Sequence, residues 1–354
     1  MTNDEGTDRT ATDRTASDVG GAGRIGWGIL ATGGIADQFT KDLRTAGLHV
    51  AAVGSRTEAR AQEFAATHDI ANAHGSWEAL AEDPTVDVVY VATPHPAHAP
   101  AALTAIAGGK HVLVEKPFTL NAVEAQQVVD AGAAAGVLVL EAMWTRWLPH
   151  MLEIRQLIAD GAIGTPQVLI ADHTQSISRD PNHRLNDPAL GGGALLDLGI
   201  YPVSFAVDLF GLPESFEVTA AFTPDTGVDR RLSATLVHPG DANTIFTTAS
   251  DLAGLNTATI IGTDGTITID TVWYAASGYT LRNAKREVVA QSRPAIEGRG
   301  MQYQALEVER LLREGRTESD RLPTAETVGI MRLLDDLRDR IGLVYPGESG
   351  RAGG

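Results

Sequence analysis

The first half of the chain alternates between two patterns, and this alternation is the feature that most restricts its fold. From Arg24 onward, short apolar runs are separated by segments in which apolar residues recur at helical spacing. The apolar runs predict strands at 25–30, 49–55, 86–93, 111–115 and 137–142. The segments between them predict helices at 36–46, 57–68, 77–81, 100–108 and 121–136. Strands that alternate with helices form βαβ units, so this half predicts a parallel sheet covered by helices on both faces.

The pattern changes after about residue 165, where strand-like runs follow one another without helices between them. These runs lie at 167–174, 217–222, 231–238, 243–250, 257–261 and 266–270. Pro239-Gly240 and Asp264-Gly265 are turn signals between them. Helices are expected at 301–314 and 324–341. The predicted fold class is therefore α/β: an N-terminal Rossmann-type parallel sheet, then a C-terminal α/β domain with a large, open-faced, mainly antiparallel sheet.

Length and composition predict the domain organisation. The chain has 354 residues, more than the ~100–200 of a typical domain. We expect a nucleotide-binding domain over 23–147 and a substrate and oligomerisation domain over 148–346. Residues 1–22 are polar and small, which predicts a disordered tail, and 347–354 are expected to form a second tail.

Composition also excludes several functional classes. No apolar run approaches the ~20 residues of a membrane span, and the N-terminus lacks the basic and apolar regions of a secretory signal. The chain contains no cysteine, which excludes disulfides and thiol catalysis and favours the cytoplasm. The formal net charge of −17 argues against a nucleic-acid partner, because binding a polyanion relies on basic clusters.

A glycine-bearing turn follows the first predicted strand. Compared with the dinucleotide-binding pattern G-x-G-x-x-G/A, Ala31 replaces the first glycine, while Gly33 and Ala36 fill the second and third positions. The helix that begins near Ile35 would present free N–H groups and its positive end to phosphates. Such a turn is often only a tight connection, but here it heads a run of βαβ units. The predicted cofactor contacts are Ala31, Thr32, Gly33, Gly34 and Ile35.

The end of the second predicted strand indicates which dinucleotide is bound. An acidic residue there would bind the ribose 2′-hydroxyl of NAD, but this chain has Ser55 and Arg56, with Arg60 one helical turn later. Guanidinium groups form charge-assisted, often bidentate bonds to phosphate, so these residues favour the 2′-phosphate of NADP. The alternatives are solvated arginines at a helix start and an NAD-specific site.

Three further segments carry candidate chemistry. Glu115-Lys116-Pro117 ends a predicted parallel strand, at the edge where open α/β sheets bind ligands. The segment 191–202 begins with a glycine triplet and continues with Asp197 and Tyr201, which at a spacing of four share one helix face. The segment 141–147 is rich in aromatic residues. Each has a plainer interpretation: a solvated lysine, a helix-capping aspartate with a half-buried tyrosine, and interdomain packing, which is favoured for Trp147.

Taken in order, the glycine turn, Glu-Lys-Pro, Glu-Ala-Met-Trp and Gly-Gly-Gly-Ala-Leu-Leu-Asp-Leu-Gly-Ile-Tyr resemble the glucose–fructose oxidoreductase/inositol dehydrogenase (Gfo/Idh/MocA) family. The resemblance extends from about Arg24 to Pro346 and is closest to the branch of dimeric dihydrodiol dehydrogenases and NADP-dependent D-xylose 1-dehydrogenases. It implies a Rossmann domain followed by an α/β domain whose open sheet forms an oligomer interface, in a homodimer or homotetramer.

The resemblance also implies roles for individual residues. Lys116 matches the catalytic lysine, with a cis bond to Pro117, and Asp197 matches the family's aspartate. Tyr201 stands where most of the family has histidine, and this departure is typical of the dihydrodiol dehydrogenase branch. The predicted residues along the cofactor also include Lys116 itself, together with Thr93, Pro94, His95, His98 and Glu115. It places Trp144 and Arg184 beside the substrate, although these two histidines and Arg184 are also compatible with ordinary surface or loop positions.

These observations predict an NADP-dependent oxidoreductase that acts on a small hydroxyl-bearing molecule. In our hypothesis, Tyr201 removes the hydroxyl proton of the substrate. The Lys116 ammonium would lower the tyrosine pKa from its ordinary ~10, and Asp197 would orient either Lys116 or Tyr201. Alternatively, Lys116 itself transfers the proton. The family resemblance implies the substrates: first an aldose such as D-xylose or D-glucose, oxidised at C1, then a trans-dihydrodiol, and third the reduction of a dicarbonyl or keto-sugar. No metal is expected, because no ligand spacing such as H-E-x-x-H occurs. The non-catalytic alternative is an NADP-binding sensor or scaffold.

Overall fold

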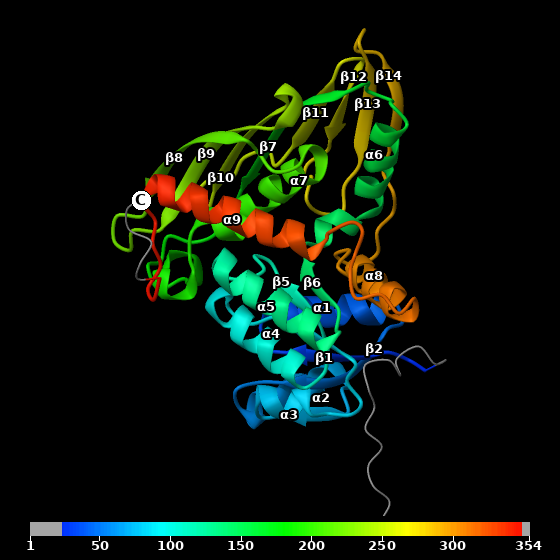
Figure 1. Ribbon diagram of the computed structural model, residues 1–354, viewed down its shortest axis with the longest axis vertical. Coiled ribbons are helices and arrows are strands. Elements are labelled where there is room, and N and C mark those ends of the chain that lie inside the picture. Colours follow the sequence, from blue (N-terminus) through cyan, green and yellow to red (C-terminus); the bar gives the residue numbers. More distant parts are fainter. Residues whose placement is uncertain (1–22, 349–354) are drawn as a thin grey trace, which may run out of the picture.

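The computed structural model describes residues 23–348, and the predicted tail at 1–22 lies outside this range. In the first half, six parallel strands form one sheet in the order β3-β2-β1-β4-β5-β6 (Figure 1). Five of them match the predicted apolar runs; β3 was not predicted because it has three residues, none fully buried. The strands are β1 (Gly26–Leu30), β2 (His49–Gly54), β3 (Asn72–His74), β4 (Val88–Val91), β5 (His111–Glu115) and β6 (Val139–Ala142).

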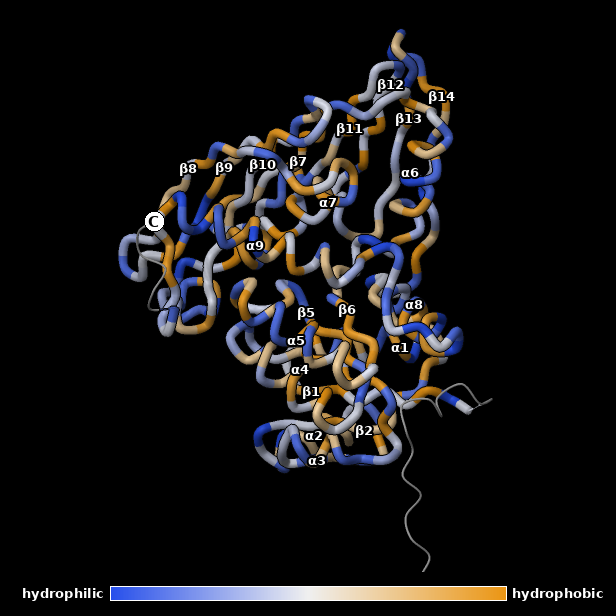
Figure 2. Tube along the Cα trace, in the orientation of Figure 1, coloured by the Kyte–Doolittle hydropathy of each residue, from blue (hydrophilic) through white to orange (hydrophobic). Residues whose placement is uncertain are grey.

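Helices separate these strands, as the alternating pattern predicts. Two of them have a side-chain cap: Ser76 Oγ accepts from the N–H of Ala79 at 3.1 Å, and Asn121 Oδ1 from that of Glu124 at 3.0 Å. Figure 2 shows the predominantly apolar course of β5 and β6, which is expected for strands buried on both faces. The helices are α1 (Gly34–Thr45), α2 (Glu58–His68), α3 (Trp77–Ala81), α4 (His98–Ala107) and α5 (Ala122–Ala135).

The second half forms an eight-stranded sheet in the order β14-β13-β12-β11-β7-β10-β9-β8. All its pairs are antiparallel except β7 with β10, which run parallel. The sequence did not predict β13 or β14; β14 is an edge strand with no buried residue. The strands are β7 (Pro166–Thr174), β8 (Ser215–Phe222), β9 (Asp229–Val237), β10 (Asn243–Ala249), β11 (Ala258–Gly262), β12 (Gly265–Ile269), β13 (Tyr279–Asn283) and β14 (Val288–Ser292).

One face of the large sheet is covered by helices and the other is open. On the covered face, α7 (Ile200–Phe210) packs on β7 and α9 (Thr324–Ile341) on β8, and α9 also contacts α5 of the first half (Figure 1). On the other face, Ile170 and Ile245 lie side by side in the register of β7 and β10, and each is 46% exposed. The expected open-faced sheet is therefore present.

The two halves are joined at several places. The helix α6 (Pro149–Ala159) leads from the first half to the second, and α8 (Gln302–Arg313) returns to pack on α1. Trp27 of β1 donates from Nε1 to Glu309 of α8 at 3.2 Å. The predicted C-terminal tail is anchored as far as Glu348, whose carboxylate pairs with the buried Arg338 at 2.7 Å.

The glycine triplet leads into an irregular helix that carries Asp197. Residues Leu195–Gly199 form a π-helical turn and continue directly into α7, so Asp197 lies in the wider turn and Tyr201 in the regular helix. The N–H of Leu195 donates to the buried Asp229 at 2.7 Å, which fixes the start of the turn. The expectation of one regular helix is corrected here; π-turns frequently occur at functional sites.

The stretch Pro188–Phe210 is long and apolar enough to cross a membrane by length and composition. Within its most apolar window, 83% is buried by the rest of the protein. This apolar stretch therefore packs in the core of the protein.

Candidate active site

The turn between β1 and α1 presents open backbone to solvent. Gly33 precedes the helix in an extended conformation without a side-chain cap, so the first-turn N–H groups of α1 have no side-chain acceptor there. A Cβ atom at Gly33 or Gly34 would meet nothing within 4 Å, while Thr32 and Ile35 beside them are half-buried. Free N–H groups at the positive end of a helix form an anion-binding site, so this turn fits the pyrophosphate of a dinucleotide.

Ala31, at the first glycine position of the motif, adopts a conformation that glycine favours. Its φ is +98°, and its N–H donates to the carbonyl of Gly54 at 2.9 Å. This bond places the glycine turn next to the end of β2. The missing glycine therefore leaves the turn formed but strained, because positive φ is unfavourable for a residue with a Cβ atom.

The end of β2 carries the residues predicted to choose between NAD and NADP. Ser55 is buried, whereas Arg56 and Arg60 are exposed. Within residues 23–348, neither guanidinium makes an ion pair or hydrogen bond. Two guanidinium groups without a partner in this part of the chain, next to the glycine turn, are suited to binding a phosphate.

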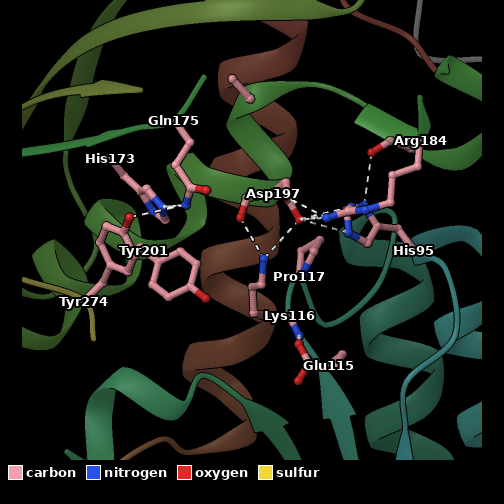
Figure 3. A network of polar contacts seen from close by, with 12 residues as sticks. His95, Glu115, Lys116, Pro117, His173, Gln175, Arg184, Asp197, Tyr201 and Tyr274 are labelled. Carbon is pink, nitrogen blue, oxygen red and sulfur yellow. Dashed lines mark hydrogen bonds and ion pairs between the residues drawn. The ribbon is translucent and has the colours of Figure 1, made fainter. Parts of the chain in front are cut away.

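Lys116 and Asp197 come from different domains and form a buried ion pair. Lys116 follows β5, and its peptide bond to Pro117 is cis, as the family resemblance implies. Its Nζ lies 3.1 Å from Asp197 Oδ1 and donates to the main-chain carbonyl of Asp197 at 2.7 Å (Figure 3). The side chains are only 13% and 7% exposed, so water screens the pair weakly.

The charges of this pair are mutually stabilised. Burial acts to lower the pKa of Lys116, but the attraction of Asp197 raises it above its ordinary value. Burial likewise acts to raise the pKa of Asp197, but Lys116, together with His95 and Arg184, holds it well below the usual range. The site therefore contains an ammonium and a carboxylate at neutral pH.

Tyr201 lies beside the ammonium, with its hydroxyl held by a second aromatic residue. Trp144 donates from Nε1 to the hydroxyl oxygen at 2.9 Å, and Lys116 Nζ lies 5.1 Å from the centre of the tyrosine ring. Burial raises the pKa of Tyr201 and outweighs the lowering effect of Lys116. The expectation of a lowered tyrosine pKa was therefore wrong: the position of the ammonium was predicted, but the burial of the phenol was not.

Glu115 is held by Rossmann-domain residues. Its buried carboxylate accepts from the hydroxyl of Tyr90 and, at 3.2 Å, from the N–H of Lys116. Tyr90 is in turn stacked on Phe39 with ring centres 3.8 Å apart. The carboxylate thus orients the turn that carries Lys116, and its predicted contact with the cofactor stays a prediction.

His98 braces the loops predicted to line the cofactor. Its ring nitrogens lie 2.8 Å from the main-chain oxygens of Pro117 and Thr93. Burial lowers the pKa of His98 to about 3, so the ring is neutral and donates through only one nitrogen. Thr93 is buried and Pro94 is exposed beside it. His98 therefore holds the Lys-Pro turn in place.

His95 and Arg184 approach the same Asp197 carboxylate oxygen as Lys116. His95 Nε2 lies 3.6 Å from Asp197 Oδ1, while its Nδ1 lies 3.0 Å from the carbonyl of Gly191. Arg184 approaches both carboxylate oxygens at 3.3 Å and is 54% exposed. Both are therefore neighbours of Asp197, and neither is an isolated surface residue.

The structure adds residues that the sequence did not indicate. The ring of Tyr274 stacks on His173 with centres 3.6 Å apart, and Gln175 Nε2 lies 2.9 Å from His173 Nε2 (Figure 3). The His173 ring also packs edge-on against Tyr201 at 4.8 Å, and burial lowers its pKa to about 3. The only signal in the sequence was a histidine and a glutamine two residues apart at the end of β7.

A Rossmann turn together with a lysine–aspartate pair and a tyrosine defines an NAD(P)-dependent oxidoreductase. Residues 25–143 match the family model described as an oxidoreductase family with an NAD-binding Rossmann fold, and residues 151–268 match the GFO/IDH/MocA C-terminal domain. The chain belongs to the Gfo/Idh/MocA family.

Curated relatives align over most of this chain. It is 37% identical to the trans-1,2-dihydrobenzene-1,2-diol dehydrogenase of Mus musculus over 328 residues, which cover 90% of this chain and 98% of the relative. The Homo sapiens enzyme of the same name is 35% identical with the same coverage. The chain is thus an NAD(P)-dependent dehydrogenase, as predicted.

Solved structures share the fold. An aldose–aldose oxidoreductase from Caulobacter crescentus complexed with glycerol superposes with a TM-score of 0.81 at 24% identity, covering 90% of this chain and 97% of the other. A mutant of a 3-ketoreductase from Actinomadura kijaniata in complex with NADP gives 0.79 at 23%, with 90% and 98% covered.

Proposed function

We propose that this protein is an NADP-dependent dehydrogenase that oxidises a hydroxyl group on a small ring-shaped substrate, first of all C1 of an aldose such as D-xylose or D-glucose. The observation that carries the proposal is the Lys116 ammonium, held by Asp197 beside the ring of Tyr201. Residues 23–147 would bind the nucleotide and 148–346 the substrate. In this assignment Trp144 and Arg184 contact the substrate, because they adjoin Tyr201 and Asp197.

Tyr201 is the proton-transfer group in this proposal. When bound, the nicotinamide ring accepts the hydride that leaves the substrate carbon. The raised pKa of Tyr201 keeps its phenol neutral at rest, so it is set to donate a proton to a carbonyl oxygen in the reductive direction. Lys116 stabilises the negative charge on that oxygen. In the oxidative direction the same atoms act in reverse, and Tyr201 must first lose its proton.

A substrate panel tests the reaction and the proton donor together. NADPH formation would be followed with D-xylose, D-glucose and a trans-dihydrodiol, in wild type and in Tyr201→Phe. We expect turnover in wild type and a loss of about 10²–10⁴-fold in the variant, the usual contribution of general acid–base catalysis. A variant that keeps near-wild-type turnover across pH would assign proton transfer to Lys116.

The trans-dihydrodiol is the second candidate substrate, and the names of the curated relatives favour it. An aldopyranose and a dihydrobenzenediol share a six-membered ring with neighbouring hydroxyls. The aromatic rings of Trp144, Tyr201 and Tyr274 offer an apolar surface for either ring. The same panel decides: higher kcat/KM for the diol than for every aldose would make this chain a dihydrodiol dehydrogenase.

The uncommitted arginines after β2 support NADP over NAD. Hydrogen bonds from charged groups contribute ~1.5–3 kcal/mol, so Arg56→Ala is expected to lower kcat/KM for NADP by about 10–100-fold while leaving that for NAD unchanged. Arg332→Ala, an exposed arginine of α9, is the matched control. If the preference for NADP over NAD is the same in Arg56→Ala as in wild type, Arg56 does not bind the 2′-phosphate.

We further propose that the protein acts in the cytoplasm as a homodimer or homotetramer. The open face of the large sheet would form the interface between its subunits. Ile170 and Ile245 lie next to each other on neighbouring central strands and are both about half exposed, so they form an apolar patch on that face. Ile245→Lys would place a charge at the centre of that face. Light scattering should then give a lower molar mass for the variant than for wild type. An unchanged molar mass would show that the interface lies elsewhere.

A further inference from the structure

Arg299 lies in the loop between β14 and α8, and this loop is fastened to the Rossmann domain. The N–H groups of Arg299 and Met301 donate to the two carboxylate oxygens of Asp42, at 3.2 and 2.8 Å. Asp42 belongs to α1 and is 1% exposed. A buried carboxylate that receives both N–H groups holds the backbone of the loop in one position.

Two glycines make this attachment possible. Gly298 and Gly300 have φ values of +68° and +96°, which residues with a Cβ atom rarely adopt. A Cβ atom at Gly298 would also lie 2.6 Å from an oxygen of Asp42. Gln302 closes the loop by donating to the carbonyl of Glu297 at 2.8 Å. The position of Arg299 is therefore determined by specific contacts.

The side chain of Arg299 extends over the candidate active site. Its guanidinium carbon lies 5.3 Å from the centre of the Trp144 ring, the same residue whose Nε1 donates to the Tyr201 hydroxyl. The charge of Arg299 opposes the burial that raises the pKa of Tyr201 and of Tyr274, so it acts on both hydroxyls. A single indole therefore separates the guanidinium from the reacting hydroxyl.

Within residues 23–348 this guanidinium makes no ion pair or hydrogen bond, and it packs on the face of Trp144. Its charge acts to lower the pKa of the buried Glu115, but that carboxylate accepts from Tyr90 and from the N–H of Lys116. The chain as a whole has 45 acidic and 28 basic residues, so an arginine without a paired carboxylate is notable. By contrast, Arg184 forms an ion pair with Asp197 at 3.3 Å.

We propose that Arg299 binds a carboxylate on the substrate, so that the site favours an acidic sugar, a hexuronic acid, over the neutral sugar. Arginine binds a carboxylate through two parallel N–H···O bonds, and a ring behind it limits its motion. In the pyranose ring of a hexuronic acid, the C1 hydroxyl and the C6 carboxylate are carried by the two carbons that flank the ring oxygen. C1 then lies by Tyr201 and the carboxylate by Arg299. This inference rests on the proposed function and adds a substrate class to it.

The test compares each neutral sugar with its acid: D-glucose with D-glucuronate, and D-galactose with D-galacturonate. In wild type, we expect KM for the acid to be about 10–100-fold lower, the effect of one charge-assisted interaction. Arg299→Ala should remove this difference in KM while changing KM for NADP by less than about twofold, and Arg299→Lys should restore part of the difference. Arg293→Ala is the matched control, because Arg293 pairs with Asp270 at 2.9 Å outside the site.

Calorimetric titration of the NADP-saturated protein with D-glucuronate separates this inference from the proposed function. Binding that weakens in Arg299→Ala but not in Arg293→Ala supports the carboxylate site, even if no neutral sugar is turned over. Equal affinity for D-glucose and D-glucuronate in wild type would overturn it. It would also be overturned if Arg299→Ala weakened both ligands equally, or raised KM for NADP alone.

Discussion

Replacing Asp197 by asparagine removes one charge from the centre of the site with little change in shape. Lys116 would keep its bond to the main-chain carbonyl of residue 197, at 2.7 Å, but lose the carboxylate at 3.1 Å. With an effective dielectric constant of about 20, two unit charges at that separation attract by about 5 kcal/mol. Breaking a buried pair in this way destabilises a protein by about 3–5 kcal/mol.

The sign of the effect on Lys116 follows from the opposing influences on its pKa. Burial acts to lower that pKa, and Asp197 raises it. Without the carboxylate the pKa of Lys116 must fall, so the ammonium loses its proton at lower pH than in wild type. Loss of one charge that stabilises a developing oxyanion typically lowers kcat by about 10²–10³-fold. We therefore expect Asp197→Asn to reduce carbonyl reduction by that factor, with the loss growing as pH rises.

The assay is kcat/KM for carbonyl reduction from pH 6 to 10, together with urea unfolding at the same pH values. Asp251→Asn is the matched control, because Asp251 pairs with Arg231 at 2.8 Å and is also mostly buried. We expect the control to keep its activity. A variant Asp197→Asn with wild-type activity and an unchanged pH profile would refute the role of the ion pair in keeping Lys116 charged.

Two further predictions follow from the raised pKa of Tyr201 and from the conformation of Ala31. Because burial raises the pKa of Tyr201, the phenolate needed for oxidation is scarce at neutral pH. The kcat/KM for oxidation should therefore rise about tenfold per pH unit towards pH 9–10. A plateau of kcat/KM near pH 7 would contradict this prediction. Ala31 has a φ of +98°, so Ala31→Gly should relieve backbone strain of ~1–3 kcal/mol. Glycine costs ~0.5–1 kcal/mol in extra chain entropy lost on folding, so the net gain should raise the melting temperature by about 2 °C. A lower melting temperature in the variant would show that the turn is not strained.

The Rossmann half could be predicted because its signals are local. Each strand of this half except β3 is a nearly continuous apolar run, since both faces of a parallel sheet are buried. The glycine turn and Lys116 lie directly after such runs, so the sequence placed both at the ligand-binding edge. Short polar strands at sheet edges, such as β3 and β14, have neither long runs nor clear alternation and were missed.

The residues that sequence did not indicate depend on contacts across long separations. Gln175 and Tyr274 are hydrogen-bonded at 3.3 Å although they are 99 positions apart in the chain. Arg299 reaches Trp144 only because Asp42, more than 250 residues earlier, fastens its loop. No local pattern encodes such pairings.

Burial limited the mechanistic prediction in the same way. The sequence indicated that a cation would lie near Tyr201, which alone would lower the phenol pKa. The packing of Trp144, His173 and Tyr274 around that phenol removes it from water, and this larger effect acts in the opposite direction. A family motif therefore predicts which groups meet, whereas their proton affinities depend on how far the surrounding side chains exclude solvent. In the proposed mechanism, this balance keeps the resting tyrosine protonated, and it is the reason that the oxidation rate should depend on alkaline pH.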